Sequence, residues 1–69
     1  MHNQIKELRK KLRISQDELA KRCKVTRQTI NAIENDKYDP TLQLAFKLSI
    51  HLKTSVDELF KFTEEDEGC

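Results

Sequence analysis

Residues 27–34 carry polar side chains of the kinds that recognise DNA bases. At about 100° per residue, Ile30 and Ile33 share one side of a helix, and the opposite side carries Gln28, Asn31 and Ala32, flanked by Arg27. Amide side chains bind adenine edges, guanidinium groups bind guanine, and a small apolar residue fits against the thymine methyl group. The segment therefore predicts a helix that contacts bases in the major groove.

Residues suited to other chemistry are few and scattered along the chain. Cys23 and Cys69 form no CxxC pair and no cluster with histidine, which disfavours a structural zinc site. His2 and His51 are isolated, and we expect both at the surface. With no nucleophile–base pair and no set of metal ligands, the chain is not expected to be an enzyme or to hold a metal or cofactor.

The length and composition predict one small helical domain. A chain of 69 residues forms a single domain, and one Gly and one Pro are too few for the turns of a β-sandwich. No apolar run approaches the roughly 20 residues that span a bilayer, and the N-terminus lacks the apolar region of a signal peptide. We expect a cytoplasmic protein with reduced cysteines, no membrane contact and no evident small-molecule ligand.

Hydrophobic periodicity predicts five helices, over about 3–12, 16–22, 27–34, 42–52 and 56–60. Four of them follow a hydroxyl residue at the N-cap position, namely Ser15, Thr26, Thr41 and Ser55. Glu18 and Glu58 complete capping boxes with the two serines. Residues 35–40 form a loop, in which Pro40 stops any continuation of the helix before it.

Charge is distributed unevenly between the two halves of the chain. Residues 1–37 hold ten Lys/Arg and five Asp/Glu, whereas residues 38–69 hold three and seven, so balances of +5 and −4 make up the net +1. A basic half suits a polyanion, although two solvated faces of a small domain are the simpler explanation of the charge pattern alone. The acidic run 64–68 predicts a disordered tail over 64–69, after a domain of residues 1–63.

Two segments, IKELRKKLRISQDELAKRCKVTRQTINAIE and PTLQLAFKLSIHLKTSVDELF, resemble the Xre/Cro-like (lambda-repressor-like) helix-turn-helix family. The resemblance covers residues 4–60. It implies an all-α, five-helix DNA-binding domain that acts on transcription, usually as a repressor and as a homodimer on a palindromic operator. It places the recognition helix at 27–34 in the major groove of double-stranded DNA.

The resemblance also assigns individual DNA contacts. It implies a phosphate contact for Gln16, contacts to the backbone and first bases for Thr26 and Arg27, base contacts for Gln28, Asn31 and Ala32, and phosphate contacts for Asn35, Lys37 and Tyr38. The alternatives to a phosphate contact are structural. Gln16 would then be an ordinary residue of the first helical turn, and Tyr38 would only cover the edge of the hydrophobic core. Arg9 and Glu34 match a buried ion pair between the first and third helices.

Three positions depart from the family pattern. Lys24 and Asp36 stand where glycine is usual, and a left-handed lysine costs about 1 kcal/mol. Asp36 adds a negative charge beside the phosphate path, which weakens the case for close contact between that loop and DNA. Cys23 replaces an aliphatic core residue, and a small buried hydrophobe is a simpler interpretation of it than a redox role.

The fourth predicted helix has more apolar surface than one small domain is expected to bury, roughly 240° of its circumference. We therefore predict a homodimer through the C-terminal half, with Ile50, Phe60 and Phe62 at the interface. Residues 61–63 are predicted to extend as a short strand against residues 1–3. The alternative is that the fifth helix and Phe62 cover the whole apolar surface.

Two other functions fit the same pattern. One is an antitoxin or accessory DNA-binding subunit that also binds a protein partner, for which the acidic tail offers a contact. The other is a helical protein-interaction module without nucleic acid, which would show no salt-dependent affinity for duplex DNA.

Overall fold

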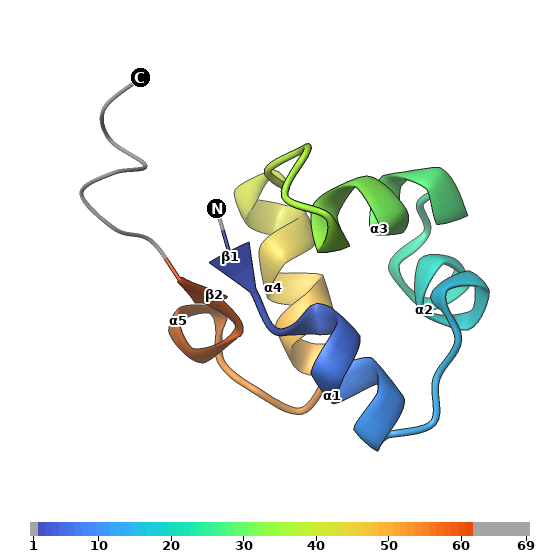
Figure 1. Ribbon diagram of the computed structural model, residues 1–69, viewed down its shortest axis with the longest axis horizontal. Coiled ribbons are helices and arrows are strands. Elements are labelled where there is room, and N and C mark those ends of the chain that lie inside the picture. The colour runs from blue at the N-terminus through green and yellow to red at the C-terminus, as the bar shows by residue number, and fades with distance from the viewer. Residues whose placement is uncertain (1, 62–69) are drawn as a thin grey trace.

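The computed structural model describes residues 2–61, which form five helices and one two-stranded sheet (Figure 1). The elements in chain order are β1 (His2–Asn3), α1 (Ile5–Lys11), α2 (Gln16–Cys23), α3 (Arg27–Glu34), α4 (Leu42–His51), α5 (Val56–Leu59) and β2 (Phe60–Lys61). The predicted five-helix fold is thus confirmed. The predicted interface residue Phe62 and the predicted acidic tail lie outside the described residues.

The predicted capping residues begin the last four helices. Each hydroxyl oxygen accepts a hydrogen bond from the backbone N–H three residues later, at 3.0 Å for Ser15, 3.2 Å for Thr26 and Thr41, and 3.4 Å for Ser55. The first helix starts later than predicted, because the Oδ1 atom of Asn3 accepts from the N–H of Ile5 at 3.1 Å and residues 2–3 lie in a strand.

Four of the five helices, α1 to α4, are followed within two residues by a residue in the left-handed conformation that is not glycine. The φ angles are 60° at Arg13, 59° at Lys24, 59° at Asp36 and 57° at Lys53. At Lys24 the turn closes in the usual way for a helix end, with the N–H of Val25 donating to the Ala20 carbonyl at 3.0 Å. The turn between α2 and α3 therefore keeps its normal shape, and Lys24 carries the conformational strain.

Glycine at these positions is expected to stabilise the protein. Lys24→Gly and Lys53→Gly should each raise the free energy of unfolding by about 0.5–1 kcal/mol, because relief of left-handed strain exceeds the added freedom of the unfolded chain. Thermal denaturation should show an increase of a few degrees for each variant. The control Lys21→Gly, inside α2, should lose about 0.5–1 kcal/mol. A loss of stability in both test variants would contradict the assignment of strain.

The two ends of the described chain pair as an antiparallel ladder, with His2 opposite Lys61 and Asn3 opposite Phe60. The predicted strand pairing is confirmed, but the second strand begins one residue earlier, at Phe60. Phe60 is only 7% exposed and belongs to the hydrophobic core. The expectation that it lies at a dimer surface is therefore corrected, since its ring already packs inside the domain.

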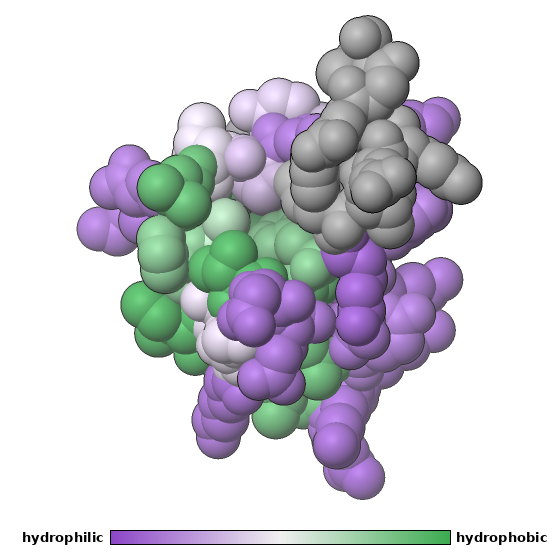
Figure 2. All heavy atoms as spheres, turned by 90° about the vertical axis from the view of Figure 1, so that its left-hand side faces the viewer, coloured by the Kyte–Doolittle hydropathy of each residue, from purple (hydrophilic) through white to green (hydrophobic). Residues whose placement is uncertain are grey.

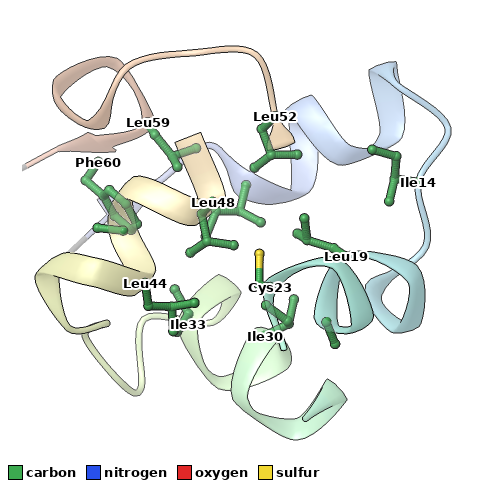
Figure 3. Packing of buried hydrophobic residues seen from close by; sticks show 13 residues of the cluster. Ile14, Leu19, Cys23, Ile30, Ile33, Leu44, Leu48, Leu52, Leu59 and Phe60 are labelled. Carbon is green, nitrogen blue, oxygen red and sulfur yellow. The ribbon is translucent and has the colours of Figure 1, made fainter. Parts of the chain in front are cut away.

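The core is built from all five helices, and Figure 3 shows its side chains converging between them. Cys23 lies near the centre of the cluster, among labelled side chains of α2, α3 and α4 (Figure 3). Burial raises the pKa of the Cys23 thiol, and the nearby positive charge of Lys47 opposes this rise in part. Cys23 is thus a buried, neutral thiol that packs as a small hydrophobe.

Residues 2–61 contain neither a membrane-spanning helix nor a cluster of metal ligands. No helix there is both long and apolar enough to cross a bilayer. No group of three or more His, Cys, Asp or Glu side chains in that part of the chain is placed to hold a metal ion.

Candidate nucleic-acid interface

The helix α3 is held against the domain by one side only. Ile30 and Ile33 are fully buried, in the same core cluster as the small buried residue Ala20 of α2. Figure 1 shows α3 at the edge of the molecule beside α2, with its outer side uncovered. The residues opposite the two isoleucines are consequently free to meet a large ligand.

The predicted base-contacting residues lie together on that outer side. Arg27, Gln28 and Asn31 are exposed and line a shallow hollow of about 250 Å³. Ala32 is half-buried, so its methyl group offers a smaller contact. The first turn of α3 has no acidic residue that would repel a phosphate or a base acceptor. This surface offers guanidinium and amide groups, the groups that hydrogen-bond base edges.

A second hollow, of about 390 Å³, lies at the start of α2 and is lined by Arg9, Ser15, Gln16, Asp17 and Arg27. Since Arg27 lines both hollows, the start of α2 adjoins the exposed side of α3. The N-terminus of a helix attracts anions through its free N–H groups and dipole. The predicted phosphate contact at Gln16 fits this position, while the carboxylate of Asp17 makes part of the same wall negative.

A buried ion pair ties α1 to α3, as predicted. The Nε and Nη2 atoms of Arg9 donate to the two carboxylate oxygens of Glu34 at 2.9 and 3.3 Å, and its Nη1 donates to the Ile14 carbonyl at 3.0 Å. The Glu34 side chain also accepts from the Nε2 atom of Gln16 at 3.2 Å. Glu34 therefore fixes Gln16, at the start of α2, relative to the end of α3.

The loop after α3 exposes Asn35, Lys37 and Tyr38, all three predicted to contact phosphates. Tyr38 is about half-exposed, which leaves both its phosphate contact and its role at the core edge open. Asp36 points its carboxylate to the N-terminal strand, where Oδ2 lies 2.8 Å from His2 Nδ1 and Oδ1 accepts from Asn3 Nδ2 at 3.3 Å. Its negative charge is therefore engaged within the domain.

Several contacts of this surface were not predicted from the sequence, among them the bond from Gln16 to Glu34. His2 was expected to be isolated but pairs with Asp36, and Asn3 donates to the carbonyl of Ile33 at 2.8 Å. Both contacts join residues 30 or more positions apart, and no local pattern predicts them. The bond from Asn35 to Asn31 was also missed, although the spacing of four residues is a visible signal.

The helix-turn-helix family model matches residues 5–59 of the chain. Curated relatives are described as HTH-type transcriptional regulators. A Methanocaldococcus jannaschii protein, MJ0272, is 43% identical over 67 residues, which cover 97% of this chain and all of the relative. An Archaeoglobus fulgidus protein is 42% identical over 66 residues, covering 96% of this chain and 93% of the relative. YgzD of Bacillus subtilis is 39% identical over 96% of this chain and its own full length.

A solved structure of a SinR protein/SinI protein complex also matches the fold. Its similarity has a TM-score of 0.79 at 32% sequence identity and covers 100% of this chain and 67% of that chain. The family match, the relatives and the exposed polar side of α3 all indicate a DNA-binding helix-turn-helix protein. The chain belongs to the Xre/lambda-repressor-like helix-turn-helix family of DNA-binding transcriptional regulators.

Proposed function

We propose that the protein is a sequence-specific repressor that binds a palindromic operator as a homodimer, with α3 in the major groove. The observation that carries this proposal is the exposed set Arg27, Gln28 and Asn31, opposite the buried Ile30 and Ile33. Two such domains on one operator would occlude a promoter by occupancy alone, so repression needs only the DNA contacts. The protein would act in the cytoplasm and without an enzymatic step.

A row of exposed apolar residues on α4 supports the homodimer. Leu42, Phe46 and Ile50 follow one another at intervals of four residues and are 69%, 52% and 70% exposed. Figure 2, which views the side of the molecule where α5 and the paired strands lie in Figure 1, shows hydrophobic atoms at the surface between hydrophilic ones. Exposed apolar side chains that are contiguous and rimmed by polar ones are typical of interaction surfaces. In a two-fold dimer through this row, the row of each copy would be buried against the other copy.

The base-contacting role of α3 is tested with Gln28→Ala. The variant should lose about 1–3 kcal/mol of binding free energy on the cognate operator and relax the preference at one base pair, because its amide no longer reaches a base edge. Titration of labelled operator and of random duplex gives both affinities. An equal loss on random DNA would contradict base recognition by Gln28.

Lys37→Ala is the matched comparison for phosphate contact. Lys37 is exposed in the loop after α3, and its removal should weaken binding to all sequences alike and flatten the salt dependence of the affinity. The two variants thus separate contacts that specify sequence from contacts that neutralise charge.

The alternative is an antitoxin or accessory subunit that binds a protein partner as well as DNA. The SinR match favours it, because that structure is a complex of SinR with a second protein, SinI. The apolar row on α4 would then dock the partner instead of a second copy. A toxin-sized reading frame beside the gene, whose purified product binds the chain in place of self-association, would decide for this alternative.

A further inference from the structure

A pair of asparagines spans the last turn of α3 and the residue that follows it. The Nδ2 atom of Asn35 donates to the backbone carbonyl of Asn31 at 2.9 Å and lies 3.3 Å from its side-chain Oδ1. Both side chains are exposed, and Asn31 lines the hollow that it shares with Arg27 and Gln28. The pair therefore lies on the surface proposed to face DNA.

These contacts determine how the Asn31 amide is turned. A backbone carbonyl only accepts hydrogen bonds, so the amide group of Asn35 nearest to it must be the NH2. The second proton of that NH2 faces the Asn31 side chain, which must present its oxygen there. A reversed Asn31 amide would set two NH2 groups against each other. The Oδ1 atom of Asn31 is thus held by Asn35, and its Nδ2 forms no hydrogen bond within residues 2–61.

The orientation matters for base recognition. An asparagine that binds adenine uses both ends of its amide, with the oxygen accepting from N6 and the nitrogen donating to N7. Here Asn35 takes one of the two lone pairs of the oxygen and turns it toward itself, whereas both protons of the nitrogen are available. This orientation favours bases that present acceptors in the major groove. Guanine presents two acceptors, N7 and O6, and thymine presents O4. Adenine also presents N7, but its N6 amino group places a donor beside it, which disfavours an Asn31 amide that only donates there.

We propose that Asn35 is a positioning residue that turns Asn31 into a hydrogen-bond donor, so that Asn31 selects guanine or thymine rather than adenine. This inference rests on the proposed sequence-specific binding through α3. It assigns Asn35 a role in specificity, in contrast to the phosphate contact that the family resemblance implies for it.

The experiment is selection of binding sites from a randomised duplex library, followed by sequencing, for the wild type and four variants, one of which is a control. Asn31→Ala identifies the base position that Asn31 contacts, because the preference there is lost. At that position the wild type should select guanine or thymine. Asn35→Ala should admit adenine and reduce the discrimination about tenfold, the scale of one lost base contact.

Asn35→Asp is the more informative variant, because it should change which base is preferred instead of only weakening the preference. A carboxylate accepts but does not donate, so the Asn31 amide should reverse, donate to the new side chain and turn Oδ1 to the groove. The preference at that one position should then shift to cytosine or adenine, which present N4 and N6 donors. The added negative charge lowers affinity for every sequence, so the base preference at this position, relative to the others, is the readout.

Lys37→Ala serves as the control, since it should reduce affinity for all sequences without changing any preference. Thermal melting of each Asn35 variant confirms that it folds. The inference is overturned if the wild type selects adenine at the Asn31 position, if Asn31→Ala alters no preference, or if both Asn35 variants only weaken binding to all sequences and lower the salt dependence. A wild type with no preference at any position would instead overturn the proposed sequence-specific function itself.

Discussion

Replacing Glu34 by alanine is expected to cost up to about 3–5 kcal/mol of the free energy of unfolding, the scale for one partner removed from a buried ion pair. The Glu34 side chain is only 3% exposed and that of Arg9 13%. Without the carboxylate, the Arg9 guanidinium stays largely buried with one remaining bond, to the Ile14 carbonyl. Small domains have about 5–15 kcal/mol of stability in total, so the loss is a large share of it.

Chemical denaturation and thermal melting measure this effect, with a decrease in Tm of more than about 12 °C at a loss of 3 kcal/mol. The control Lys21→Ala removes an exposed pair, in which Lys21 Nζ lies 3.6 Å from Asp17, and should change stability by less than about 0.5 kcal/mol. Equal stability of Glu34→Ala and the wild type would show that the pair is open to water in solution.

A double variant separates the two sources of the loss. In Arg9→Met with Glu34→Leu, neither charge remains, so part of the stability should return relative to Glu34→Ala. If the double variant is no more stable than the single one, then lost packing and the lost anchor of Gln16 account for the effect, and the unpaired guanidinium does not.

Ile50→Glu is expected to have the second large effect, a loss of operator affinity of about 10²–10⁴-fold through loss of the dimer. Ile50 is 70% exposed on α4 and contributes little to the core of the single domain. A carboxylate there would have to be desolvated in a two-fold interface, where it would also face the apolar row of the second copy. The variant should therefore fold normally and remain monomeric.

Sedimentation at high micromolar concentration measures the oligomeric state, and footprinting measures the operator. In the wild type we expect a dimer whose two protected half-sites lie about 34 Å apart, one turn of DNA. Lys10→Gln on α1 lowers the net charge by the same amount as Ile50→Glu and serves as the control, with the dimer retained. A wild type that is monomeric at this concentration and still binds its operator fully would reject the homodimer.

The sequence alone determined the helices and the side of α3 that faces outward. Capping residues such as Thr26 and Thr41 act on backbone groups three residues away, so their effect is visible in a short window. The period of the isoleucines in α3 likewise depends only on helix geometry. The base-contacting candidates followed from these local signals, and the structure brings Arg27, Gln28 and Asn31 to one surface.

Only the tertiary structure decided how the ends and loops of these elements are tied together. Asn3 lies outside the predicted first helix because its side chain bonds to both Ile5 and Ile33. Phe60 lies in the core because its strand pairs with residues 2–3. Glu34 joins Arg9 and Gln16 from two other helices, and Asp36 is held by the N-terminal strand. Each contact needs residues that are distant in sequence to be packed first, and packing is a property of the whole core rather than of any local pattern.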